Sequence, residues 1–211
     1  MTRLPFISLD GLDGAGKSTQ CRLLAQWLRD QGLPVTECHD PGGTALGLQL
    51  RTLLLSFRGA MALATEALLF MASRAQLIDE VIRPALDAGH VVIADRFLLA
   101  NVVYQGHAGG LDPETLWQIG LFATGGLEPD LTLLLDLPLE DSMARREREA
   151  DRLESRDLDY HARVREGFLA EARRRPERIR VVDAAGAVDQ VQQNLRLEVR
   201  RHFPAMTRGV A

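Results

Sequence analysis

Apolar positions along the chain follow two patterns that alternate from one end to the other. Short continuous apolar runs predict strands buried on both faces, and they lie at Leu4–Leu9, Val35–His39, His90–Ala94, Leu131–Leu137 and Ile179–Asp183. Longer stretches with apolar residues at helical spacing predict helices, and they lie at Lys17–Gln31, Thr44–Ser56, Thr65–Asp87, Pro113–Thr124, Leu139–Ala172 and Ala187–Arg201. The alternation predicts an α/β fold, an open parallel sheet of about five strands with helices on both faces.

Length and organisation predict a single domain over residues 1–211. Chains of roughly 100–200 residues usually form one domain, and no internal repeat or low-complexity linker divides this one. No apolar run reaches the ~18 uncharged residues of a membrane span, and the N-terminus lacks the apolar segment and cleavage site of a signal peptide. We therefore expect a cytoplasmic protein with no membrane partner.

Charge and cysteine content exclude several classes of function. The net charge is −4, with 29 acidic against 25 basic residues, whereas a general nucleic-acid binder would be basic. Cys21 and Cys38 form no CxxC or Cys/His cluster, so neither a disulfide framework nor a zinc site is expected. Among the 25 basic residues only Lys17 is a lysine, which indicates a specific requirement at that position.

Lys17 lies in a glycine-rich loop between the first predicted strand and the first predicted helix. The segment Gly11–Ser18, GLDGAGKS, matches the pattern G-x-x-x-x-G-K-[ST] at every fixed position. In such a loop the exposed N–H groups and the helix dipole bind phosphate oxygens, the lysine reaches the β- and γ-phosphates, and the serine hydroxyl ligates Mg²⁺. The predicted nucleotide-binding residues are Gly11, Leu12, Asp13, Gly14, Ala15, Gly16, Lys17, Ser18 and Thr19.

A nucleoside triphosphate site narrows the class without naming the reaction, because kinases, GTPases and transport ATPases share this loop. A GTPase would offer the guanine motif N-K-x-D, which cannot exist when the only lysine is in the phosphate loop. Transport ATPases and helicases are usually longer and carry further signatures that are absent here. A small kinase is the class that remains.

Two further segments follow predicted strands and belong with this loop, because ligands bind beyond the carboxyl ends of parallel strands. Asp95-Arg96 offers a carboxylate that can hold Mg²⁺ and a guanidinium that can grip a phosphate. The alternative is a structural ion pair at the end of a strand. Asp40–Thr44, DPGGT, is a glycine turn that enters a helix.

Seven segments occur in a fixed order along the chain: GLDGAGKS, DPGGT, LRTLL, LLFMASRAQL, ADRF, YQG and DRLE. Together they resemble bacterial thymidylate kinases, from about Phe6 to about Phe168. The resemblance implies a P-loop nucleoside monophosphate kinase fold with a short lid at about residues 145–159. It also implies a homodimer that transfers the γ-phosphoryl group of ATP to dTMP with Mg²⁺.

The resemblance assigns roles around the base and sugar of dTMP. Phe70 would stack on the thymine and Arg74 would reach a carbonyl oxygen of the ring, four residues along one helix face. Asn101 and Gln105 would make polar contacts at the base, and Tyr104 would exclude a ribose 2′-hydroxyl. Without the resemblance, Phe70 and Tyr104 would be interpreted as packed aromatic residues and Arg74 as a solvated charge.

The resemblance also assigns groups around the phosphates. These are Arg51 and Arg96 at the dTMP phosphate, Asp10 between the two nucleotides, Pro41 in the substrate set, and Ser18 and Asp95 as metal ligands. The family often has Arg-Glu before the Pro-Gly-Gly turn, where this chain has His39-Asp40, so one phosphate contact is either missing or supplied by Arg51. A serine common shortly after the Asp-Arg pair is Ala100 here, which puts one substrate hydrogen bond in question.

Four arginines in the lid region are spaced three, four and four residues apart: Arg145, Arg148, Arg152 and Arg156. This spacing predicts a positive stripe on one helical face. Some family members carry a catalytic arginine inside the phosphate loop and others in the lid. Because the loop interior here is Gly14-Ala15, the resemblance implies a lid arginine, with Arg152 as first choice and Arg148 as second. Interleaved acidic residues favour the alternative of a salt-bridged, solvated helix.

Two other functions stay open on the sequence. A different small P-loop kinase could act on another nucleoside monophosphate or on a deoxynucleoside, and the residues Phe70, Arg74 and Tyr104 discriminate against it. A non-catalytic nucleotide-binding regulator would keep the phosphate loop but would need neither Arg96 nor the lid arginines.

Overall fold

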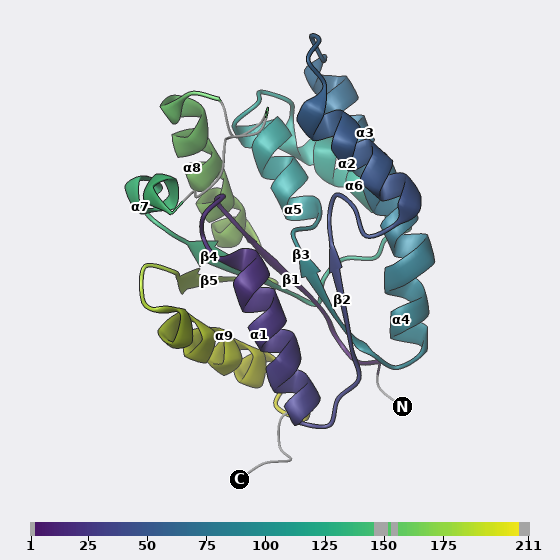
Figure 1. The fold of residues 1–211 in the computed structure, drawn as a ribbon, viewed down its shortest axis with the longest axis vertical. Coiled ribbons are helices and arrows are strands. Elements are labelled where there is room, and N and C mark those ends of the chain that lie inside the picture. The colour runs from purple at the N-terminus through teal and green to yellow at the C-terminus, as the bar shows by residue number, and fades with distance from the viewer. Residues whose placement is uncertain (1–2, 146–151, 153–155, 207–211) are drawn as a thin grey trace.

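The computed structural model describes residues 3–145, 152 and 156–206, and within them the predicted strands form one sheet (Figure 1). The strands are β1 (Phe6–Gly11), β2 (Val35–His39), β3 (Val91–Asp95), β4 (Leu131–Asp136) and β5 (Ile179–Asp183). They are ordered β2-β3-β1-β4-β5, and every neighbouring pair is parallel. The predicted five-stranded parallel sheet is therefore confirmed.

Helices cover both faces of the sheet (Figure 1). They are α1 (Lys17–Asp30), α2 (Ala45–Ser56), α3 (Leu63–Leu77), η1 (Ile78–Ile82), α4 (Arg83–Asp87), α5 (Leu98–Asn101), η2 (Val102–His107), α6 (Pro113–Ala123), α7 (Leu139–Ala144), α8 (Leu158–Arg174) and α9 (Val188–His202). On β1, Ile7 and Leu9 pack with α1 and α9, while Phe6 packs with the helices of the other face. This double coverage explains why the strands appear as continuous apolar runs.

The long predicted helix Thr65–Asp87 is confirmed as α3, η1 and α4 in succession. Its middle, η1, is a π-helical turn just before Pro84, in which the Arg83 N–H donates to the Ile78 carbonyl five residues back. Proline has no N–H and its ring collides with the preceding turn of an ordinary α-helix. The wider π turn lets the helix continue through the proline.

One helix was not expected from the sequence. Residues Leu98–His107 form α5 and the π-helical η2 directly after the Asp95-Arg96 pair. Most of this segment is buried, Gly106 included. A helix that is almost entirely buried has no solvent-exposed polar face, so it gives only a weak helical periodicity in the sequence.

The single charged helix expected over Leu139–Ala172 is wrong. The segment contains two helices, and the described residues between them, Arg145, Arg152, Arg156 and Asp157, are not helical. Asp157 begins α8 by accepting the Tyr160 N–H on its side chain at 2.7 Å, the contact of an N-cap. The cap starts a new helix where the sequence pattern suggested a continuous one.

The register of the sheet gathers the functional loops at one edge. Leu9 of β1 pairs with Asp95 of β3, and Asp95 pairs with His39 of β2. The segments after these three strands therefore leave the sheet side by side, as expected for parallel strands.

No helix in the described ranges is both long and apolar enough to cross a membrane.

Candidate active site

The glycine loop joins β1 directly to α1. Gly16, at φ 86°, precedes α1, and no side chain caps the first turn of that helix, which leaves backbone donors for an anion. Gly14 has φ 84°, and a Cβ there would lie 2.3 Å from the Ser142 carbonyl oxygen on α7, so only glycine fits. Lys17 is buried and its ammonium donates to the Leu12 carbonyl at 2.7 Å, which places the charge inside the loop.

The two predicted metal ligands meet at the end of β3. The Ser18 hydroxyl donates to a carboxylate oxygen of Asp95. No group of three or more His, Cys, Asp or Glu side chains that could hold a metal alone occurs in the described part of the chain. Mg²⁺ in phosphoryl-transfer sites is held by one or two protein oxygens together with the phosphates, so a hydroxyl and a carboxylate in contact fit that ion.

Arg96 ties the phosphate loop to the neighbouring pocket. Its guanidinium donates to the Gly11 carbonyl at 2.9 Å, to Asp13 at 2.5 Å and to the Tyr104 hydroxyl at 3.2 Å, and that hydroxyl donates to the other Asp13 oxygen at 3.0 Å. Burial alone would raise the pKa of Asp13, but the charges of Arg96 and Lys17 hold it well below its usual range. The backbone of Arg96 has φ 68°, a strained conformation for a non-glycine residue.

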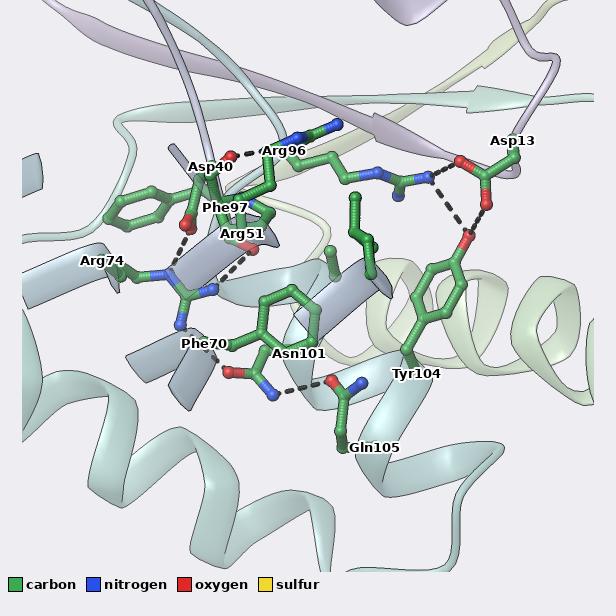
Figure 2. A pocket seen from close by; sticks show the side chains of 13 residues that line it. Asp13, Asp40, Arg51, Phe70, Arg74, Arg96, Phe97, Asn101, Tyr104 and Gln105 are labelled. Carbon is green, nitrogen blue, oxygen red and sulfur yellow. Dashed lines mark hydrogen bonds and ion pairs between the residues drawn. The ribbon is translucent and has the colours of Figure 1, made fainter. Parts of the chain in front are cut away.

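A cavity of about 610 Å³, counted with its open mouth, lies beside this cluster (Figure 2). Its lining residues are Asp13, Asp40, Pro41, Arg51, Leu55, Phe70, Arg74, Arg96, Phe97, Ala100, Asn101, Tyr104 and Gln105. All predicted substrate residues except Asp10 are among them.

Arg74 is fully buried, so its interpretation as a solvated charge is wrong. Its Nε donates to Asp40 at 2.6 Å and its Nη1 to Asn101 at 3.2 Å, as Figure 2 shows. Burial raises the pKa of Asp40, and the charge of Arg74 opposes that rise. Phe70 is half-buried and lines the cavity, so it is not a core residue. Arg51 reaches the same cavity and donates to the Pro41 carbonyl at 3.0 Å.

Comparison with known proteins identifies the family. The sequence profile described as "Thymidylate kinase" matches residues 9–195. The chain belongs to the thymidylate kinase family. A thymidylate kinase of Symbiobacterium thermophilum is 50% identical over 207 residues, which cover 97% of this chain and 96% of that protein. A thymidylate kinase of Rhodopirellula baltica is 52% identical over 190 residues, covering 90% of this chain and 78% of that protein.

The fold of this family member also matches a solved structure. The crystal structure of thymidylate kinase from Ehrlichia chaffeensis superimposes with a TM-score of 0.79 at 27% identity. The match covers 94% of this chain and all of that one. The P-loop nucleoside monophosphate kinase fold expected from the sequence is thereby confirmed.

The lid arginines do not form the expected helical stripe. Arg145 follows α7 and donates to the carbonyls of Ala184 and Ala185, while Arg152 and Arg156 lie outside any helix. Arg148 falls outside the described residues. The three described arginines therefore do not share one helical face, because the segment is not a continuous helix.

Arg152 and Arg156 both contact Glu66, a residue that the sequence interpretation missed. Arg152 donates to Glu66 at 2.7 Å and to the Leu54 carbonyl at 2.8 Å, and Arg156 donates to both carboxylate oxygens of Glu66 at 2.9 and 3.0 Å. Glu66 is an acidic residue in the largely apolar stretch 63–71, spaced four and eight residues before Phe70 and Arg74. That spacing puts all three on one helix face, a signal that could have identified it.

Asp10 is the one predicted substrate residue that lies outside the cavity lining. It is fully buried on β1, and neither of its carboxylate oxygens has a hydrogen-bond partner in the structure. Burial raises its pKa from 3.8 to about 7, although the charges of Arg96 and Lys17 act in the opposite direction. An unpartnered buried carboxyl at the end of the central strand is a group available for a ligand.

Replacement of Asp10 should change how stability depends on pH. The folded protein holds the Asp10 proton up to about pH 7, whereas the unfolded chain releases it near 3.8. The contribution of Asp10 to wild-type stability therefore falls between these values, by up to about 1.4 kcal/mol per pH unit. Asp10→Asn lacks this loss, so its free energy of unfolding relative to wild type should rise from pH 4 to pH 7 and then level off.

Urea denaturation at several pH values, without nucleotide or Mg²⁺, measures this difference. Asp87→Asn, which changes an exposed carboxyl at the end of α4, is the matched control and should show no such trend. A difference between Asp10→Asn and wild type that does not vary with pH would contradict the expectation.

Proposed function

We propose that this chain transfers the γ-phosphoryl group of ATP to dTMP, giving dTDP and ADP. Family membership supports the reaction, and one geometric observation carries it. Arg96 lines the pocket and at the same time donates to Gly11 and Asp13 of the phosphate loop. A nucleotide in the pocket would therefore have its phosphate next to the loop that binds ATP.

The donor side would work by positioning and by neutralising charge, which is most of what phosphoryl transfer requires. The loop backbone and Lys17 would bind the β- and γ-phosphates. Ser18 and Asp95 would hold Mg²⁺, which supplies charge neutralisation at the phosphates when it is bound. Asp10 would lie between the two nucleotides, where a carboxyl without a partner can accept a hydroxyl or a metal-bound water.

The acceptor side would use the pocket. Phe70 would stack on the thymine, and Arg74, held by Asp40, would meet a carbonyl oxygen of the base in a fixed orientation. Tyr104, whose hydroxyl is held by Arg96 and Asp13, would occupy the space that a ribose 2′-hydroxyl needs. Arg96 and Arg51 would bind the dTMP phosphate. Asn101, Gln105 and Pro41 would make the remaining contacts with dTMP.

A homodimer and a cytoplasmic location belong to the same proposal. Three adjacent helices each expose large apolar side chains: Leu48 and Leu53 on α2, Leu68 on α3 and Phe122 on α6. Phe122 is 87% exposed, and a largely apolar groove runs between α3 and α6. Contiguous apolar surface of this kind marks an interface, and an isologous contact across these helices would cover it.

A panel of nucleoside monophosphates tests the reaction. In a coupled assay with ATP and Mg²⁺, kcat/KM for dTMP should exceed that for AMP or GMP by at least about 10²-fold, because the base contacts and Tyr104 suit a deoxypyrimidine. Lys17→Ala should lose about 10²-fold or more in turnover, which shows that the activity belongs to this site. AMP or GMP as the best acceptor would overturn the proposal.

Arg152→Ala separates two roles for the lid arginine. If Arg152 leaves Glu66 to neutralise phosphate charge in the transition state, its loss should lower kcat by at least about 10²-fold with little change in KM for dTMP. We expect this outcome, and a much smaller loss of kcat for Arg145→Ala, because Arg145 donates to the carbonyls of Ala184 and Ala185 just after β5. Retention of most of the kcat would limit Arg152 to its contacts with Glu66 and Leu54.

Phe122→Asp tests the dimer. A charge buried within an apolar interface costs several kcal/mol when it is desolvated, so the variant should elute and scatter light as a monomer of 23.3 kDa while the wild type has twice that mass. Leu197→Asp, an equivalent change at an exposed leucine of α9, should leave the dimer intact. A Phe122→Asp dimer, or a monomeric wild type, would contradict the proposal.

A further inference from the structure

A chain of buried hydrogen bonds runs along one side of the pocket from Arg74 to Glu66. Arg74 Nη1 donates to Asn101 Oδ1 at 3.2 Å, Asn101 Nδ2 donates to Gln105 Oε1 at 2.7 Å, and Gln105 Nε2 donates to Glu66 Oε1 at 2.9 Å. Figure 2 shows the first three members in a row along one side of the cavity. Every member donates to the next, so the chain has one direction from end to end.

The charges at the two ends set that direction. Arg74 has only donors and Glu66, as a carboxylate, has only acceptors. Turning either amide by 180° would bring a donor against a donor or an acceptor against an acceptor at both of its neighbours. The orientations of Asn101 and Gln105 are thus fixed by electrostatics, with both side chains almost completely buried.

Glu66 is the end of the chain that the pocket itself does not explain. It does not line the cavity, yet it is only 1% exposed, and its carboxylate receives Gln105 together with Arg152 and Arg156. A buried carboxylate is costly unless paired and hydrogen-bonded. Here both oxygens are used, which makes Glu66 the acceptor on which the amide chain depends.

We propose that Glu66 is a positioning residue for the base, because it fixes which hydrogen-bonding groups Gln105 and Asn101 present to the substrate. After the chain is made, each amide keeps one N–H and one oxygen lone pair for a ligand. Thymine offers an N3–H donor beside the O4 acceptor, whereas cytosine offers an N3 acceptor beside the N4 amino donor. If the two amides have fixed orientations, their free N–H and oxygen match the hydrogen-bonding edge of only one of these bases. Amides that could turn would bind both bases. The inference rests on the proposed function, since it takes the base to occupy this pocket.

Glu66→Gln tests the idea with almost no change in shape. The new side chain has one carbonyl oxygen, and three donors compete for it: Gln105, Arg152 and Arg156. Hydrogen bonds from charged donors are the stronger ones, so the arginines should take the oxygen and the new NH₂ group should face Gln105. Gln105 would then be driven to turn, and the direction of the chain would be lost.

The readout is discrimination between dTMP and dCMP as acceptors, which a purely structural role would not move. We expect the ratio of kcat/KM values, dTMP over dCMP, to fall at least about tenfold in Glu66→Gln, while the affinity for a non-hydrolysable ATP analogue stays within twofold of wild type. Glu80→Gln removes the same charge from an exposed position on η1, in the same continuous helical segment. It should match the wild type in both measurements.

A double-mutant cycle shows whether the effect passes through Gln105. In a Gln105→Met background, Glu66→Gln should change the dTMP over dCMP ratio by less than twofold, because the amide it positions is already gone. If Glu66→Gln does not fold, Glu66→Asp carries the same test, since it keeps the charge but is too short to reach Gln105 and both arginines together.

The outcomes separate the inference from the proposed function. A wild type that does not phosphorylate dTMP removes the proposed function before any variant is made. With an active wild type, a ratio unchanged in Glu66→Gln, an equal effect of Glu66→Gln with and without Gln105, or failure of both Glu66 variants to fold would each overturn the positioning role.

Discussion

The ion pair between Arg96 and Asp13 joins the two halves of the site. Arg96 comes from the end of β3 and Asp13 from the loop after β1, so the contact fixes the substrate pocket against the phosphate loop. It holds a backbone with a positive φ at Arg96, which the surrounding contacts must stabilise. Tyr104 completes the cluster from η2. A displacement of this pair would change the position of the acceptor relative to the donor, which phosphoryl transfer tolerates poorly.

Charged side chains are buried in this site beyond what the stability of a small α/β domain requires. Arg74 pairs with Asp40, Glu66 pairs with Arg152 and Arg156, and the Asp10 carboxyl has no hydrogen-bond partner. Buried ion pairs of this kind often add nothing to stability, although breaking one by removing a single partner typically costs about 3–5 kcal/mol. Their concentration around one cavity points to orientation of polar groups as the role they serve.

Local signals explain most of what could be predicted from the sequence. The strands follow from continuous apolar runs, and the phosphate loop from a motif with eight consecutive positions, Gly11–Ser18. The segment Leu98–His107 was not predicted as a helix because it is almost entirely buried and has no solvent-exposed polar face. The break between α7 and α8 was missed because charged residues recur at helical spacing on both sides of Asp157. Aspartate is a common N-cap residue, but that signal was overlooked within the charged stretch.

The pairings of charges depended on contacts distant in sequence. Without the family resemblance, Arg74 would have been interpreted as a solvated charge, because its partner Asp40 lies 34 residues away on another element. Glu66 drew no attention for the same reason, since Gln105 and Arg152 are 39 and 86 residues from it. The family resemblance placed Arg74, Asn101 and Gln105 in one pocket, but only the fold reveals which atom of each meets the next.

The π-helical turn η2 makes the length of its segment part of the site. Because η2 holds more residues per turn than an α-helix, deleting one residue from Val102–His107 would let the segment close into regular α-helix. The helix on either side would keep its direction, because the deletion removes only the extra residue of the wide turn, but the side chains inside the turn, Tyr104 and Gln105 among them, would move relative to the pocket. The one extra residue of this turn therefore sets where Tyr104 and Gln105 lie in the pocket.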